Sequence, residues 1–221
     1  MNVLDAITKR RSFRSYKQDP VPKEILEKVL DTCRYVSSWT NTHCWELHVL
    51  CGKPLNELKQ ALAKKMAADE PPNPDILPPN FYGVHLQRKT EAIEVSQRSC
   101  GVSPEDKEAC KRFDTTMVRF FDAPVGLIAC TERSAAPAVL PDVGIVFQTI
   151  MLAAYNYGLG TCTQYSVVMY ADVLRRLLGI PESKLIVLGM AIGYPDLDAP
   201  VNNFARPRYP LEALVTWRGF D

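Results

Sequence analysis

Apolar residues recur along the chain in two rhythms, one helical and one extended. A spacing of three to four residues predicts helices over five segments: 3–9, 22–35, 55–66, 141–157 and 171–178. Segment 141–157 is apolar on almost every side, so we expect it to lie centrally in the core. Gly158 is placed to end that helix.

Three segments have the pattern of strands. Residues 46–52 alternate apolar and polar side chains, as in a strand with one buried face. Residues 123–131 and 184–195 are continuous apolar runs bounded by turn residues, which is typical of buried strands. Strands that alternate with helices indicate an α/β or α+β fold. We expect a single domain over residues 1–221, because such domains often reach ~250 residues.

Other segments lack a regular period. Residues 35–45 are rich in Ser, Thr and Asn, which is typical of a loop. The proline-rich stretch 69–83 cannot form a regular element, because proline nitrogens donate no hydrogen bond. We interpret 69–119 as an excursion or lid, with one or two helices after residue 83. The tail from Val201 onward has no helical period but carries apolar residues that need a partner surface.

Composition and charge narrow the class of protein. An apolar content of 47% and a charged content of 23% are globular values. The 26 basic and 25 acidic residues nearly cancel, so we expect no nucleic-acid or membrane partner. No apolar run reaches the ~18 residues of a spanning helix, and the first residues do not form a signal peptide. Seven scattered cysteines favour a reducing, cytoplasmic location.

Several common catalytic motifs are missing from the sequence. It has no GxGxxG, no phosphate-binding GxxxxGK[ST], no GxSxG and no HExxH. One group of residues has the composition of a metal site: His43, Cys44, His48 and Cys51. His48 and Cys51 are three apart on a predicted strand, so their side chains point to opposite faces. We therefore predict no metal site.

Two groups of arginines are the sharper signal. Arg10, Arg11, Ser12 and Arg14 follow the first predicted helix, and Arg206 with Arg208 lies in the tail. Cations at a helix end complement its dipole, which accounts for Arg10 but less well for Arg14. The alternative is a clamp on a phosphate or another anion, which guanidinium groups bind in a bidentate manner. For the tail pair, solvated surface charge is the competing explanation.

The loop within 35–45 offers a second kind of binding surface. Its polar and aromatic side chains suit a ligand that joins a polar chain to a flat ring, although such loops often bind nothing. The candidates are Ser37, Ser38, Trp39 and Asn41.

Taken in order, these motifs resemble the FMN-dependent nitroreductase family. The segments KRRSFRSY, PVPKEILEKVLDTC, SSWTNTHCW, GLGTC, AIGYP and ARPRYPLEALVTW carry the resemblance over about 1–52 and 123–217. The segments PPNFYGVHLQR and APVNNFARPRYPLE are similar to the subgroup related to nitrobenzoate reductases. The resemblance implies an α+β nitroreductase-like fold with a central, mostly antiparallel sheet flanked by helices. It also implies an intertwined homodimer with FMN at the subunit interface.

The resemblance also implies roles for individual residues. Arg10, Arg11, Ser12 and Arg14 would hold the phosphate and the pyrimidine edge of FMN, and Arg206 with Arg208 would form a second phosphate clamp. Ser37, Ser38, Trp39 and Asn41 would cover the flavin from the other subunit. Thr163, Gln164, Tyr165 or Ser166 would lie near the flavin N5, with backbone amides as the contacts. Ser37, His43 and Cys44 depart from the family pattern, which leaves the shape of that loop open.

The implied chemistry belongs to the cofactor, and we assign no catalytic acid. NADH or NADPH would reduce the flavin and leave, and a nitroaromatic or quinone acceptor would then take two electrons in a ping-pong mechanism. Two alternatives stay open from the sequence. One is a flavoenzyme of the same fold with different chemistry, such as dehalogenation, dehydrogenation or flavin breakdown. The other is a non-catalytic FMN-binding module.

Overall fold

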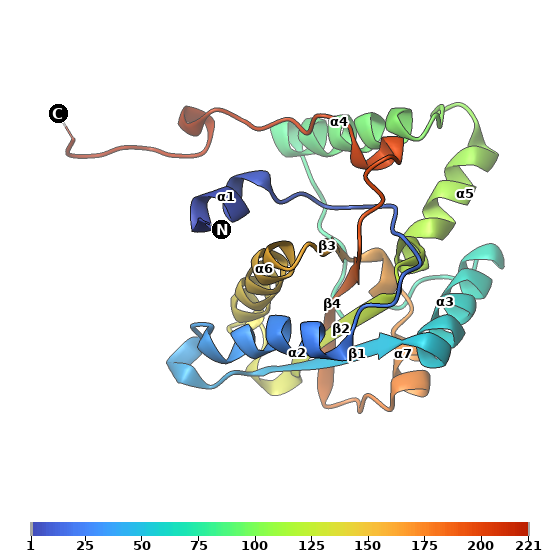
Figure 1. Ribbon diagram of the computed structural model, residues 1–221, viewed down its shortest axis with the longest axis horizontal. Helices are drawn as coiled ribbons and strands as arrows, with labels where there is room; N and C mark the ends of the chain where they lie inside the picture. The colour runs from blue at the N-terminus through green and yellow to red at the C-terminus, as the bar shows by residue number, and fades with distance from the viewer. Residues whose placement is uncertain (1, 221) are drawn as a thin grey trace.

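The computed structural model describes residues 2–220, in which helices surround one four-stranded sheet (Figure 1). The helices are α1 (Val3–Lys9), α2 (Lys23–Asp31), α3 (Gly52–Ala67), α4 (Gly83–Ser99), α5 (Lys107–Val118), α6 (Leu140–Asn156) and α7 (Ala171–Leu178). The strands are β1 (Trp45–Cys51), β2 (Val125–Glu132), β3 (Gly160–Gln164) and β4 (Lys184–Gly193).

The sheet has the order β1-β2-β4-β3, and each neighbouring pair is antiparallel. The apolar runs predicted as buried strands are β2 and β4, which occupy the centre of the sheet. β3 forms one edge, and Ser12 of the N-terminal segment pairs with Thr161 beside it. The predicted α+β fold with an antiparallel sheet is confirmed.

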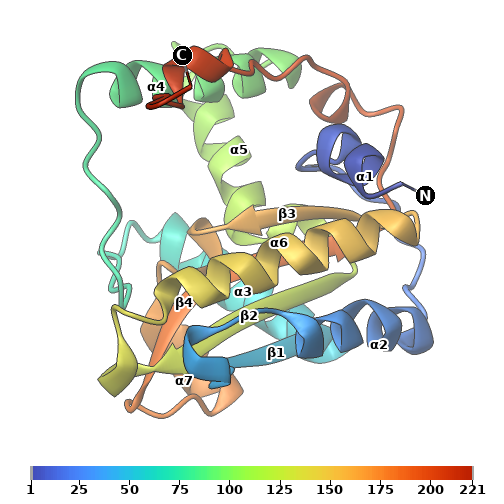
Figure 2. The same ribbon diagram turned by 90° about the vertical axis from the view of Figure 1, so that its left-hand side faces the viewer.

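Helices cover both faces of the sheet. One core joins β2 and β4 to α2 and α6, and the other joins the sheet to α3, α5 and α7. α6 packs on one face of the sheet with Val146 and Ile150 fully buried, but Ile145 is 42% exposed, so the helix is not buried on every side as its sequence predicts. α4 lies apart from the sheet, and the C-terminal segment runs away from the body past α1 (Figures 1 and 2).

Two predicted helices have different boundaries in the structure, and one strand was not predicted. Helix 22–35 becomes α2 and a single 3-10 turn over 32–35, and helix 55–66 begins earlier, at Gly52. Gly158 has a φ of 72° directly after α6, which confirms it as the terminating glycine. The sequence did not predict β3, because its five residues follow a helix end and carry only two β-branched side chains among GTCTQ.

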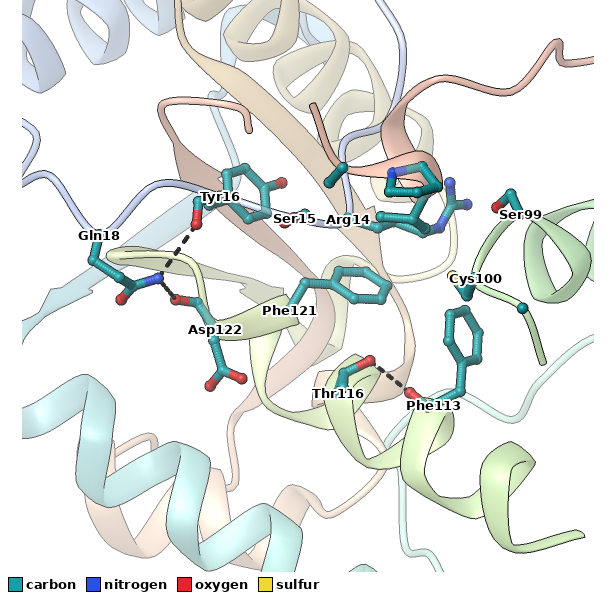
Figure 3. Close-up of a pocket in the computed structure, with 14 residues that line it drawn as sticks. Arg14, Ser15, Tyr16, Gln18, Ser99, Cys100, Phe113, Thr116, Phe121 and Asp122 are labelled. Carbon is teal, nitrogen blue, oxygen red and sulfur yellow. Dashed lines mark hydrogen bonds between the residues drawn. The ribbon is translucent and has the colours of Figure 1, made fainter. Parts of the chain in front are cut away.

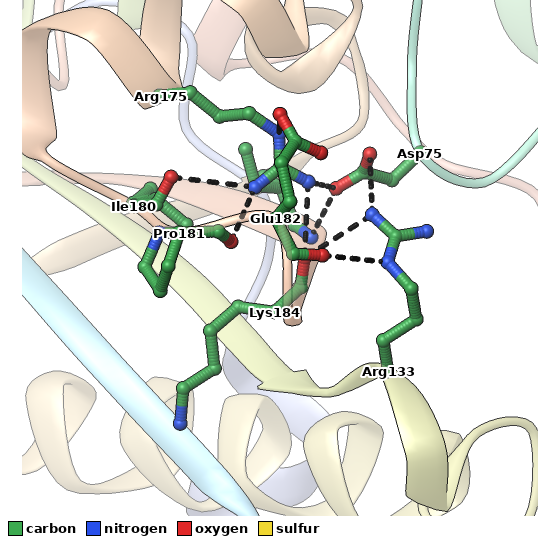
Figure 4. A network of polar contacts seen from close by, with 8 residues as sticks. Asp75, Arg133, Arg175, Ile180, Pro181, Glu182 and Lys184 are labelled. Carbon is green, nitrogen blue, oxygen red and sulfur yellow. Dashed lines mark hydrogen bonds and ion pairs between the residues drawn. The ribbon is translucent and has the colours of Figure 1, made fainter.

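The proline-rich stretch 69–83 forms no helix or strand before α4 begins at Gly83, but its first half is bound to the body. The Asn73 amide donates to the Met169 carbonyl over 2.9 Å. Asp75 accepts from Arg175 over 2.6 Å and from the Ile186 amide over 2.8 Å, and Arg133 lies 3.2 Å away (Figure 4). The excursion expected over 69–119 can therefore begin only after Asp75, which is bonded to the body of the protein.

Neither a metal-binding group nor a membrane-spanning helix is found among residues 2–220. No group of three His, Cys, Asp or Glu side chains is arranged to hold a metal ion. None of the described helices combines the length and the apolar character needed to cross a bilayer.

Candidate functional site

The N-terminal segment after α1 is extended and lies along the edge of the sheet. The Phe13 amide donates to the Thr161 carbonyl of β3 over 3.0 Å, and the Lys17 amide donates to the Tyr194 carbonyl over 2.9 Å. These bonds fix the backbone on both sides of Arg14. The arginine motif therefore has a defined position at β3 and is not a frayed helix end.

Asn202 joins this segment to the C-terminal part of the chain. Its side chain is fully buried; Oδ1 accepts from the Arg14 amide over 2.8 Å and Nδ2 donates to the Ser15 carbonyl over 2.9 Å. Its backbone carbonyl accepts from Arg11 Nη1 over 2.9 Å. Sequence reasoning missed Asn202, although the asparagine pair at 202–203, just before Arg206 and Arg208, was the available signal.

Arginines from the two ends of the chain lie close together near Asn202. Arg206 Nη2 donates to the Ser12 carbonyl over 2.5 Å, 194 residues away in sequence. Burial, together with the charges of Arg14 and Arg11, lowers the pKa of Arg206 to about 10. Arg14, Arg206 and Arg208 line one cavity of about 200 Å³, together with Arg88 of α4.

No carboxylate neutralises this cluster within the described chain. None of the ion pairs among residues 2–220 includes Arg10, Arg11, Arg14, Arg206 or Arg208. Arg10 Nε and Arg14 Nη1 are buried and find no hydrogen-bond partner within residues 2–220. Buried donors of this kind cost free energy unless a ligand satisfies them. Arg14 and Arg206 are thus partly buried charges without a carboxylate partner among residues 2–220, as an anion site would require, whereas Arg208 is exposed.

The arginines predicted to form one site line two different cavities. Arg11 faces a separate cavity of about 480 Å³ with Lys9 and Tyr155, and its guanidinium lies 5.8 Å from the centre of the Phe13 ring. Cys162 of β3 lies beneath the cluster: burial raises the pKa of its thiol, although Arg14 and Ser12 oppose that effect. A buried thiol with a raised pKa stays neutral and serves as packing.

The end of β3 and the residues that follow it contact the last turn of α5. Gln164 Nε2 donates to the Met117 carbonyl over 2.7 Å and Ser166 Oγ donates to the same oxygen over 3.2 Å. Tyr165 donates to the Ile76 carbonyl of the anchored stretch, and burial raises the pKa of its phenol. Gln164 Oε1 is buried and has no hydrogen-bond partner among residues 2–220.

A larger cavity of about 750 Å³ lies on the other side of Arg14 (Figure 3). Its wall combines Arg14 with the rings of Phe113 and Phe121 and with Cys100. Phe120, Phe121 and Asp122 all have positive φ values near 50°. Left-handed backbone at non-glycine residues is strained and tends to occur at functional sites. The volume and the mixed lining suit a small aromatic molecule.

The loop with Ser37, Ser38, Trp39 and Asn41 does not join the arginines within one chain. The Trp39 amide donates to Asp142 Oδ2 over 2.9 Å at the N-terminal end of α6. Lys9 and Arg11 lie by Tyr155 at the other end of that helix, which has 17 residues and is therefore about 25 Å long. Thr40, Asn41 and His43 have positive φ values, and Trp39 is 61% exposed.

Comparison with known proteins places this geometry in a family. The sequence model of the nitroreductase family matches residues 7–194. The chain belongs to the nitroreductase family. It is 30% identical over 219 residues to 4-nitrobenzoate reductase of Pseudomonas putida, with 97% of this chain and 95% of the relative covered. It is 32% identical over 221 residues to chloronitrobenzene nitroreductase of Comamonas testosteroni, with 96% and 95% covered.

Solved structures agree with the family assignment. The FMN- and NADPH-dependent nitroreductase NfnB from Sphigopyxis sp. strain HMH superposes with a TM-score of 0.95 at 27% identity, with both chains fully covered. The FMN-dependent NfnB from Mycobacterium smegmatis, in complex with NADPH, gives 0.92 at 27% identity, with 97% of each chain covered. This chain therefore has the nitroreductase fold.

Proposed function

We propose that this protein is an FMN-dependent NAD(P)H oxidoreductase that reduces nitroaromatic or quinone-type acceptors. The observation that carries the proposal is the meeting of guanidinium groups from both chain ends, with buried donors on Arg10 and Arg14 that no protein group satisfies. Relatives named as nitrobenzoate and chloronitrobenzene reductases support the acceptor class. NfnB structures named for FMN and NADPH support the cofactor and the donor.

The side chains present fit a flavin mononucleotide. Arg14, Arg206 and Arg208 line one cavity and supply cationic donors for a phosphate. Arg10 Nε and Gln164 Oε1 are further buried polar atoms without a partner among residues 2–220. FMN, when bound, supplies the two-electron chemistry between NADH or NADPH and the acceptor. The chain's own contribution is to bind, to orient and to exclude water. Arg14 also places a positive charge between the phosphate-sized cavity and the larger aromatic one.

We further propose that the site is completed in a homodimer. The covering loop and the arginines lie near opposite ends of α6 in one chain, so only a second chain brings such a loop to the arginines. Apolar side chains on α1 and on the tail are exposed, and they require a partner surface. They are Val3, Leu4, Ile7, Leu211, Leu214, Trp217 and Phe220.

A cytoplasmic location is part of the same proposal. Cys33, Cys130 and Cys162 are buried in the core as small apolar side chains, and all seven cysteines are free thiols. Free thiols persist in reducing compartments. The proposal includes no nucleic-acid partner, because the charge of +1 offers no broad basic surface.

The deciding experiment is the visible spectrum of the purified full chain. We expect flavin absorbance that bleaches when NADH or NADPH is added without oxygen and returns when a nitrobenzoate is added. Bound FMN without turnover of nitroaromatics or quinones would assign the protein to different flavin chemistry. A bound flavin that no pyridine nucleotide reduces would indicate a non-catalytic FMN-binding module. A colourless protein that does not bind added FMN would overturn the proposal.

A further inference from the structure

Arg88 of α4 belongs to the arginine cluster, although it comes from neither end of the chain. It lines the cavity of about 200 Å³ with Arg14, Arg206 and Arg208. Its Nε atom is buried and has no hydrogen-bond partner in the part of the chain that the structure describes. Its neighbours on that wall, Ala92 and Val95, are apolar, so α4 brings no carboxylate into the cavity.

The position of Arg88 is fixed by the tail. Its guanidinium stacks on the Tyr209 ring at 3.9 Å from the ring centre, and the Tyr209 hydroxyl donates to Glu91 one turn further along α4 over 3.3 Å. Stacking holds the guanidinium plane while its N–H groups stay free for a ligand. Arg206 is held in a similar way, 4.3 Å from the centre of the Phe204 ring.

Charge and size together define the ligand. Four guanidiniums around a cavity of this volume match a phosphate monoester, a compact dianion that accepts several charge-assisted hydrogen bonds. We propose that Arg88 is a further binding residue for the phosphate of the flavin nucleotide, and that the bound phosphate thereby ties α4 to both ends of the chain. This proposal rests on the proposed function, since it takes FMN as the ligand.

The test compares FMN with riboflavin, which has the same ring and no phosphate. Dissociation constants are measured by quenching of flavin fluorescence with full-length apoprotein carrying Arg88→Ala, Arg88→Lys or Lys89→Ala. Lys89 is the matched control, because it is the next residue on α4, is exposed and does not line the cavity. A melting temperature within about 2 °C of wild type shows that each variant folds.

We expect Arg88→Ala to weaken FMN binding about 10- to 100-fold, because a charge-assisted hydrogen bond contributes ~1.5–3 kcal/mol. The affinity of Arg88→Ala for riboflavin should not change. The FMN affinity of Arg88→Lys should lie between those of wild type and Arg88→Ala, and the FMN affinity of Lys89→Ala should equal that of wild type. Hydrogen exchange supplies the second readout: FMN should slow exchange in residues 83–99, and riboflavin or the Arg88→Ala chain with FMN should not.

Three results would overturn the role of Arg88. The first is that Arg88→Ala binds FMN as wild type does, while Arg14→Ala loses FMN binding. The second is that Arg88→Ala loses affinity for FMN and riboflavin equally. The third is that Arg88→Ala binds FMN normally but has a higher KM for NADPH. The last result would assign Arg88 to the 2′-phosphate of the electron donor. Failure of the proposed function gives a different pattern, because the wild-type chain would then bind neither flavin.

Discussion

At the scale of single residues, Arg206 shows a conflict between binding and stability. Burial and the neighbouring Arg14 and Arg11 lower its pKa to about 10, so the folded chain holds this proton less tightly than the unfolded chain does. Between the folded value and the ordinary value of 12.5, the unfolded state binds more protons, and native stability therefore rises with pH. At neutral pH the charge of Arg206 opposes folding until an anion arrives.

We therefore expect Arg206→Gln to leave the apoprotein as stable as wild type or more so, with a melting temperature higher by about 1–3 °C. The difference should stay constant below pH ~10 and shrink only as the pH rises through that value toward 12.5. Inorganic phosphate should raise the melting temperature of wild type and have less effect on the variant, because a ligand stabilises the state that binds it. Arg112→Gln on exposed α5 is the control, and scanning calorimetry is the measurement. A clearly less stable apo variant would contradict this account.

At the scale of elements, one buried carboxylate holds the stretch before α4 to the sheet. Burial alone would raise the pKa of Asp75, but the Ile186 amide and Arg175 outweigh it, so the pKa lies below its ordinary value of 3.8 (Figure 4). Asp75 and Arg175 are only 10% and 11% exposed. Removing one partner of such a pair leaves the other charge buried and unpaired.

Asp75→Asn should lower the free energy of unfolding by about 3 kcal/mol at neutral pH. The contribution of Asp75 is complete above the ordinary pKa and is lost as the pH falls through the lowered folded value, so the difference should shrink below pH ~4. Asp69→Asn is the matched control: its pair with Lys111 is exposed, and it should change stability by less than about 1 kcal/mol. Urea unfolding at several pH values measures both. An equal effect of the two variants would show that Asp75 is not the anchor.

The contact between β3 and the arginine segment depends on a glycine. A Cβ atom at Gly160 would lie 2.7 Å from Phe13 Cδ2 and 3.1 Å from Pro195 Cβ. Phe13 is buried, so its ring cannot move without shifting Ser12 and Arg14 beside it.

We expect Gly160→Ala to cost about 1–3 kcal/mol of stability, as overpacking does, and to weaken FMN binding at the same time. Gly144→Ala on α6 has no atom within 4 Å of the added Cβ, and it should stabilise the chain by up to about 1 kcal/mol. Thermal unfolding and FMN titration separate the two effects. Normal FMN affinity in a destabilised Gly160→Ala chain would show that the arginine segment does not depend on this contact.

At the scale of the whole molecule, local sequence patterns predicted most helices and strands but not the long-range contacts between them. The apolar runs of β2 and β4 are long enough to be recognised, whereas β3 is short and takes its place from pairing with β4. Arg206 and Ser12 meet across 194 residues, a contact that no local period encodes. Arg88 sits on an exposed helix with no marked apolar face, so only its three-dimensional neighbours reveal it.

The dimer proposal makes the sharpest prediction at this scale. If each site combines the arginines of one chain with the loop of the other, two damaged chains can restore one site. We take Arg14→Ala/Arg206→Ala as the first chain and Trp39→Ala/Asn41→Ala as the second. Neither homodimer should retain tight FMN binding. In a mixed dimer, one site receives both defects and the other receives intact arginines from the second chain and an intact loop from the first.

We therefore expect one tightly bound FMN per mixed dimer, or half of the wild-type content per chain. The chains carry different affinity tags, are unfolded and refolded together, and are purified on both tags in turn; flavin content follows from absorbance. Sedimentation of each species must give the mass of two chains of 24.8 kDa. If loop and arginines of one chain served the same site, both sites of the mixed dimer would be damaged and no FMN would be retained. That outcome, or a monomeric wild-type chain, would contradict an interface site.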